Sequence, residues 1–175
     1  MEIVPTFVPN LYAFQFPKEE FDELERVFDD WKNQLFLFDF FTENEADLKG
    51  TFTVEEAVEK TREEVKKFRR KMLALANSNP HQLNEFFANL YNNEYQLSLL
   101  QRQKAKQSWL RLYALKITQK DEEDLYVITG GMIKLTQNME DRNHGEKERT
   151  KINQCRDYLK TIGVYDLESF FEICF

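Results

Sequence analysis

The sequence predicts an α+β fold in which a small antiparallel sheet packs against an extended helical block and a C-terminal helix. Two changes of pattern predict it. Apolar residues recur at every third or fourth position through much of 21–91, the spacing of amphipathic helices. They alternate at every second position within 108–136, the spacing of half-buried strands, and helical spacing returns from Glu146. Because strands and helices occupy separate stretches, we expect them to segregate in space.

The chain length favours a single domain. The 175 residues suffice for one substantial core, and 16 of them are Phe. We therefore expect one domain, 1–175, made of three consecutive parts. These are a strand with a helical block (10–91), a β-hairpin core with a helix (92–162) and a C-terminal tail (163–175).

The first half reads as a strand followed by helices. Residues 11–16 alternate and end at Pro17, as an edge strand does. The stripe over 21–38 predicts one amphipathic helix with an acid-rich, solvated outer face. Thr53 and Glu56 form a capping-box pattern that opens a helix reaching about residue 75, and a short helix follows Pro80.

The second half reads as strands followed by a helix. A strand is expected over 94–100, and a longer pair over 108–118 and 124–136 forms a hairpin. A helix is expected over 146–160, with Gly163 as its stop.

The charge distribution sets apart one segment of the chain. The formal net charge is −7, yet residues 101–120 carry six Lys or Arg and no Asp or Glu. Such a basic strip on an acidic protein indicates either a local anion site or a surface that pairs with the protein's own acids.

Several classes of protein are not indicated. No window approaches the ~20 apolar residues of a membrane span, and the N-terminus lacks a basic region before an apolar run, so we expect no membrane contact and a cytoplasmic location. Cys155 and Cys174 stand far apart without a CxxC spacing, so neither a metal site nor a disulfide framework is expected.

The hairpin places cations beside a glycine gap. Alternation puts Trp109, Arg111 and Tyr113 on one face, and Gly130, Met132 and Lys134 on the same face of the partner strand. Glycines within a strand often allow a close approach of a ligand or another backbone. A guanidinium fork with a nearby ammonium would then hold a phosphodiester. Two other interpretations stay open: the glycines form a β-bulge, or Arg111 pairs with an acid of the first helix.

These residues resemble a family. The second half of the chain is similar to the core of RelE/HigB-type toxins of bacterial toxin–antitoxin systems. The similarity lies in the segment from Arg111 to Lys116, in a strand ending in Lys134, and in a polar run that leads into a charged helix. The resemblance covers about residues 92–162. Leu135 stands where that family has a second basic residue, and the helical block is longer than in typical members.

The resemblance implies a metal-independent endoribonuclease that needs no cofactor and cleaves ribosome-bound mRNA. It implies an antitoxin protein as partner, with DNA reached only through that antitoxin. Arg111 would stabilise the charge of the phosphate, and Lys134 would assist it. Arg142 and His144 would add cationic and acid–base groups, and His144 is the best candidate proton carrier because imidazole titrates near 6.5. The residues expected to contact RNA are Lys104, Lys106, Lys116 and Thr136.

Two other functions remain open. One is a non-catalytic interaction protein, for which exposed aromatic residues within 21–41 would be the sign. The other is a binder of a small anionic ligand at the gap formed by Gly130 and Gly131, on a degenerate toxin fold.

Overall fold

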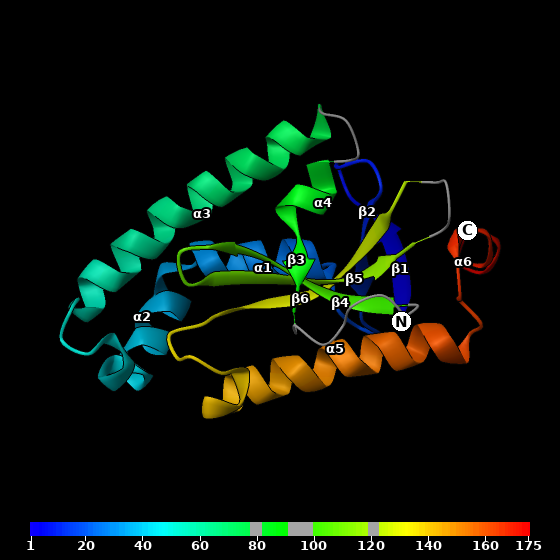
Figure 1. The fold of residues 1–175 in the computed structure, drawn as a ribbon. Helices are drawn as coiled ribbons and strands as arrows, with labels where there is room; N and C mark the ends of the chain where they lie inside the picture. Colours follow the sequence, from blue (N-terminus) through cyan, green and yellow to red (C-terminus); the bar gives the residue numbers. More distant parts are fainter. Residues whose placement is uncertain (78–81, 91–99, 119–122) are drawn as a thin grey trace.

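The computed structural model describes residues 1–77, 82–90, 100–118 and 123–175. The fold belongs to the α+β class, as predicted, with helices on both faces of one sheet (Figure 1). The strands are β1 (Glu2–Pro5), β2 (Leu11–Gln15), β3 (Ala88–Asn89), β4 (Leu100–Gln107), β5 (Leu110–Ile117) and β6 (Leu125–Ile133). The helices are α1 (Glu23–Lys32), α2 (Gln34–Glu43), α3 (Val54–Ala76), α4 (Gln82–Phe86), α5 (Asn143–Thr161) and α6 (Leu167–Cys174), with short 3-10 turns η1 (Glu45–Leu48) and η2 (Met139–Asp141).

The sheet is mixed, where an antiparallel sheet was expected. Its order is β1-β2-β6-β5-β4-β3. The neighbours β2 and β6 run parallel, and every other neighbouring pair is antiparallel. Parallel neighbours require a long connection, and the whole helical block together with β3, β4 and β5 lies between β2 and β6 in the chain.

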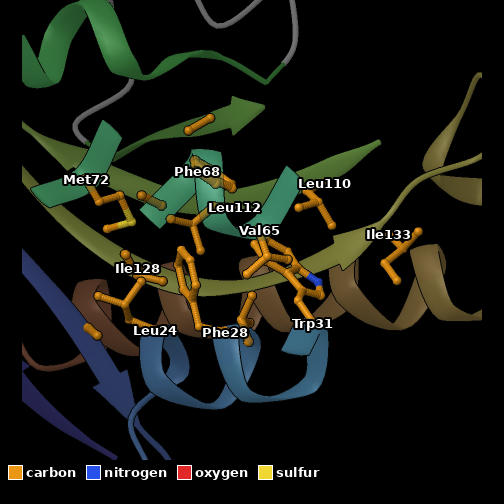
Figure 2. Packing of buried hydrophobic residues seen from close by; sticks show 14 of the residues in the cluster. Leu24, Phe28, Trp31, Val65, Phe68, Met72, Leu110, Leu112, Ile128 and Ile133 are labelled. Atoms are coloured by element: carbon orange, nitrogen blue, oxygen red, sulfur yellow. The ribbon is translucent and has the colours of Figure 1, made fainter. Parts of the chain in front are cut away.

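Two hydrophobic cores lie on opposite faces of the sheet. On one face, α1, α2, α3 and α4 pack around Trp31, Phe68 and Leu112 (Figure 2). On the other face, α5 and α6 cover Tyr113 and Leu115. Leu112 and Tyr113 are consecutive, so the alternation of a strand is what divides β5 between the two cores.

The expected single helix over 21–38 is two helices. Asn33 ends α1 and caps α2, because its side chain accepts hydrogen bonds from the backbone N–H groups of Leu35 and Phe36 at 3.0 and 3.1 Å. The expected capping box is confirmed at the start of α3. There the Glu56 N–H donates to Thr53 Oγ1 at 3.2 Å, and the Thr53 N–H donates to Glu56 Oε2 at 2.8 Å.

The first part of the basic strip forms a strand that the sequence pattern did not predict. Residues 100–107 form β4, in which only Leu100 and Ala105 are apolar. The strand expected over 94–100 lies outside the described residues except for Leu100. The strand expected from Ser108 begins at Leu110, because Ser108 adopts a left-handed φ of 54° in the turn after β4. Trp109 therefore does not share a face with Arg111: its ring packs against Phe41, and its Nε1 donates to Thr61 Oγ1 at 2.9 Å.

The C-terminal part is more helical than expected. Helix α5 begins at Asn143 rather than Glu146, and the tail contains α6, which Asp166 caps by accepting from the Ser169 N–H at 2.8 Å. In the part of the chain that the structure describes, no helix combines the length and apolar character needed to cross a membrane.

Candidate functional site

Four cations line one cavity at the end of the central strands. Lys104 and Lys106 of β4, Arg111 of β5 and Lys134, just after β6, border a hollow of about 390 Å³. We call these four residues and the hollow the cationic pocket. The loop 137–140 closes one side of it. Three of the four side chains are half-buried, and Lys106 is exposed.

Strand register explains why these residues meet. Lys106 stands directly opposite Arg111 in the antiparallel pair of β4 and β5, and Lys104 stands opposite Tyr113. Opposite residues share a face, so both lysines lie on the face of Arg111. On β6, the other neighbour of β5, Met132 is opposite Arg111. Lys134 follows two residues later, and its N–H donates to the Trp109 carbonyl at 2.8 Å. The expected sharing of one face by Arg111, Met132 and Lys134 therefore holds in the structure.

The guanidinium of Arg111 is held by the backbone. Its Nη1 donates to the carbonyl oxygens of Ser108 at 2.6 Å and Leu110 at 2.9 Å. Among the described residues no carboxylate lies within ion-pair distance of Arg111, so the expected alternative of a pair with an acid of the first helix is not what the structure has. The backbone fixes the position of this side chain, and no carboxylate in the described part of the chain pairs with its charge.

The like charges of the pocket disfavour one another. Burial lowers the pKa of Lys104, and the nearby charges of Arg111 and Lys106 lower it further. Burial likewise lowers the pKa of Lys134, as do Arg111 and Lys104, against the opposite effect of Asp141 and Glu140. Burial also lowers the pKa of Arg111. A bound anion would relieve this repulsion.

The carboxylate at the rim is held by a partner on α5. Glu140 lines the pocket, and its Oε1 accepts from Arg149 Nη1 at 2.7 Å. This ion pair keeps the only carboxylate among the described lining residues engaged elsewhere. The place of Glu140 beside the site follows from its position in the loop after Lys134, but Arg149 was not identified from sequence, since nothing in the spacing of Glu140 and Arg149 signals that they meet.

Arg142 and His144 are not brought to the cationic pocket. Arg142 makes a bidentate ion pair with Asp47, with Nε to Oδ2 at 2.8 Å, beside a separate cavity. The ring of His144 packs edge-on against Phe40 of α2 at 5.1 Å between centroids. Burial lowers the pKa of His144, while a hydrogen bond with the backbone of Ile133 opposes that shift. Both side chains join the start of α5 to the helical block.

Lys116 and Thr136 also lie apart from the pocket. Lys116 pairs with Asp124 at 2.9 Å, and its ammonium lies over the ring of Tyr126, 5.8 Å from the centroid. The hydroxyl of Thr136 donates to the Asn138 carbonyl at 3.0 Å, next to the cavity of Arg142. Of the eight residues expected at the site, the structure assembles Lys104, Lys106, Arg111 and Lys134.

The glycine gap is filled by protein. The register of β5 and β6 shifts between Tyr113 and Ala114, which places an irregularity of the β-bulge kind beside Gly130, whereas Gly131 pairs regularly with Leu112. A Cβ on Gly130 would lie 2.1 Å from Glu148 Oε1 of α5, and a Cβ on Gly131 would lie 2.8 Å from Val27 Cγ1 of α1. The glycines let the two helices approach the strand, which corrects the expectation of a small ligand at this gap.

A buried ion cluster joins α1 to α5 at that point. Lys151 Nζ lies 2.7 Å from Glu23 Oε2 and 3.1 Å from Glu148 Oε2, and Arg26 binds Glu23 through two hydrogen bonds of 2.8 and 3.0 Å. Burial raises the pKa of Glu148 to about 7, against the opposite effect of Lys151. The cluster is a structural contact between helices and lies outside the cationic pocket.

Comparison of the chain with family models, curated proteins and solved structures gave no match. The functional argument therefore rests on the geometry of the cationic pocket.

Inorganic sulfate is expected to stabilise the protein through this pocket. At a sulfate concentration ten times Kd, binding to the folded state alone adds about 1.4 kcal/mol to the free energy of unfolding. Thermal unfolding in sodium sulfate, compared with sodium chloride of equal ionic strength, measures the effect. Arg111→Ala should reduce it to the general stabilisation that sulfate gives by its exclusion from protein surfaces, and Lys66→Ala, which removes an exposed lysine of α3 paired with Glu63, should retain it in full. Equal responses of the two variants would contradict an anion site here.

Glu148→Gln is expected to remove a pH dependence of stability. The pKa of Glu148 in the folded protein is about 7, against an ordinary value of 4.5, so this carboxyl costs the protein stability progressively as pH rises from 4.5 to about 7. The amide mimics the protonated form. The free energies of unfolding of the two proteins should agree near about pH 4, and the variant should be more stable by about 1–3 kcal/mol at pH 8.

Urea unfolding of both proteins at each pH measures this difference. Glu146→Gln, an exposed carboxyl on the same helix, is the matched control and should give no such trend. A Glu148→Gln variant that is less stable than wild type at pH 8 would refute the assignment.

Proposed function

We propose that the cationic pocket binds a phosphodiester of RNA, and that the protein acts there as a metal-independent endoribonuclease of the RelE/HigB toxin type. One observation carries the proposal. Four cations converge on one hollow, and the described carboxylate at its rim is engaged by Arg149. Phosphate contacts dominate the affinity of proteins for nucleic acids, and Arg is the side chain whose geometry best matches phosphate oxygens.

The chemistry of RNA cleavage assigns a role to each group. The 2′-hydroxyl loses a proton and attacks the phosphorus, negative charge builds on the phosphate oxygens, and the leaving 5′-oxygen takes up a proton. Arg111 is anchored by two backbone carbonyls and presents its charge to the phosphate. The lowered pKa values of Lys104 and Lys134 make these ammonium groups better proton donors and their neutral amines accessible as proton acceptors.

This assignment moves the proton carrier from histidine to lysine. His144 packs on Phe40 and does not line the pocket, so the proposal does not use it. Arg142 is committed to Asp47 and serves to hold the start of α5. The proposed site is therefore smaller than the one the resemblance implies, and it lies entirely on β4, β5 and the residue after β6.

The partners follow from the same proposal. Ribosome-bound mRNA in the cytoplasm is the substrate, and an antitoxin protein silences the enzyme by covering the pocket. The net charge of −7 opposes docking on RNA, so contact with RNA is confined to the cationic surface.

A second candidate function is a non-catalytic interaction module. Exposed apolar side chains on and before α1 and α2 favour it, and Leu35 is the most exposed of them at 70 %. The others are Phe21, Phe36 and Phe38. In this alternative the sheet is scaffold, and substitutions in the cationic pocket leave function unchanged.

Induction of the protein in a bacterial host is expected to stop protein synthesis. Incorporation of labelled amino acids should fall within minutes for wild type and stay near the uninduced level for Arg111→Ala, Lys134→Ala at equal expression. The matched control is Arg62→Ala, Lys66→Ala, which removes two cations that form exposed ion pairs on α3. It should inhibit as wild type does.

Mapping of mRNA 5′ ends in the same cells separates cleavage from binding. New 5′ ends that need Arg111 and Lys134 support the endoribonuclease. Inhibition of synthesis that persists in the double variant would refute it and favour the interaction module.

A further inference from the structure

A second cavity adjoins the cationic pocket at the edge of the sheet. Its volume is about 570 Å³, and it lies among α3, α4, β3 and β4. Lys104 and Lys106 line both this cavity and the cationic pocket. We call it the edge pocket. Two hollows on either side of one strand therefore share the same two lysines.

The short strand β3 explains the opening. It pairs with β4 only through Ala88 with Lys104 and Asn89 with Gln103. Among the described residues no strand continues along the outer edge of β4 beyond Lys104. The edge at Ala105–Gln107 is therefore left to α3 and α4, whose side chains leave a hollow there.

The edge pocket adds a cation and an aromatic ring. Lys71 of α3 lines it, and Lys71 Nζ donates to Gln107 Oε1 at 2.6 Å, which holds the ammonium beside β4. Phe86 of α4 is half-buried, and its ring packs against those of Phe68 at 5.6 Å and Phe87 at 5.1 Å between centroids. Glu85 is the carboxylate among the described residues that line this cavity.

These features match the way proteins hold unpaired nucleotides. Single-stranded nucleic acid is bound by a cationic groove that follows the backbone and by aromatic side chains on which bases stack. Lys71, Lys104 and Lys106 supply the groove, and Phe86 supplies a ring fixed by its neighbours. Cavities of 390 and 570 Å³ lie in the size range of small-ligand sites.

We infer that the edge pocket is a subsite for the nucleotide next to the one in the cationic pocket, so that the ligand is a single strand of RNA laid across β4. This inference rests on the proposed function and adds a second nucleotide subsite to its site. A mononucleotide or a free phosphate would fill one hollow and leave the other unused. A duplex keeps its bases stacked inside and offers none to Phe86.

The inference predicts that affinity depends on the length of the RNA. Fluorescence anisotropy at low salt would measure Kd for a labelled 2′-O-methyl hexauridylate, which cannot be cleaved at its 2′-oxygen, and for the matching mononucleotide, which fills only one hollow. Wild type should bind the hexamer at least about tenfold more tightly. Lys71→Ala and Phe86→Leu should each weaken hexamer binding about five- to tenfold and change mononucleotide binding less than twofold. Arg111→Ala should weaken both.

Controls and outcomes separate the inference from the proposed function. Lys66→Ala removes an exposed lysine of α3 that lines neither cavity and should bind as wild type does. Thermal melting verifies that Phe86→Leu is folded, and the surface variant Lys71→Ala tests the subsite independently of the core.

Three results would overturn the inference. If Lys71→Ala and Phe86→Leu leave the Kd of the hexamer unchanged while Arg111→Ala raises it, the subsite is overturned and the proposed function is retained. Equal affinity for a duplex of the same length overturns the single-strand assignment. Binding of the hexamer and of the mononucleotide that is indifferent to Arg111 overturns the proposed function and the subsite with it.

Discussion

The close approach of α1 and α5 to β6 is the constraint on which the cationic pocket depends. Gly130 and Gly131 carry no side chains, so both helices come near the strand from opposite faces, and Lys151 bridges Glu23 of α1 to Glu148 of α5. This contact fixes α5 relative to the sheet. The residues between β6 and α5 must then turn back over the end of β5, where they form one wall of the pocket.

The cations of the cationic pocket stay close together although burial and mutual repulsion disfavour their charged forms. Burial disfavours the charges of Lys104, Arg111 and Lys134; the charge of Arg111 adds to this effect at both lysines, and the charge of Lys104 adds to it at Lys134. Elsewhere on the described surface, cations such as Lys116 and Arg142 are paired with carboxylates. Uncompensated charge in a partly desolvated hollow is typical of functional sites rather than of structural ion pairs.

Site residues could be predicted from the sequence only where the alternation of a strand determines which face of the sheet a side chain lies on. Arg111 and Lys134 meet because alternation and hairpin pairing fix their face, and both rules can be read from residue spacing. Arg142 and His144 follow a loop, whose path depends on distant contacts with Asp47 and Phe40 that no local pattern encodes. The glycine gap was recognised, but its occupants come from α5, which follows β6, and from α1 near the start of the chain, and no local pattern signals that either helix packs there. Strand β4 was missed because only two of its residues, Leu100 and Ala105, are apolar, and they do not alternate with polar residues in the way that marks a half-buried strand.

The salt dependence of RNA binding tests the central claim most directly. Each cation that neutralises a phosphate of a single strand contributes about −0.7 to the slope of log K against log salt concentration. One phosphate in the cationic pocket and one at the edge pocket predict a slope of about −1.4 for wild type with the uncleavable hexamer. Arg111→Ala should lower its magnitude by about 0.7. A slope near zero, or one that Arg111→Ala leaves unchanged, would contradict the account.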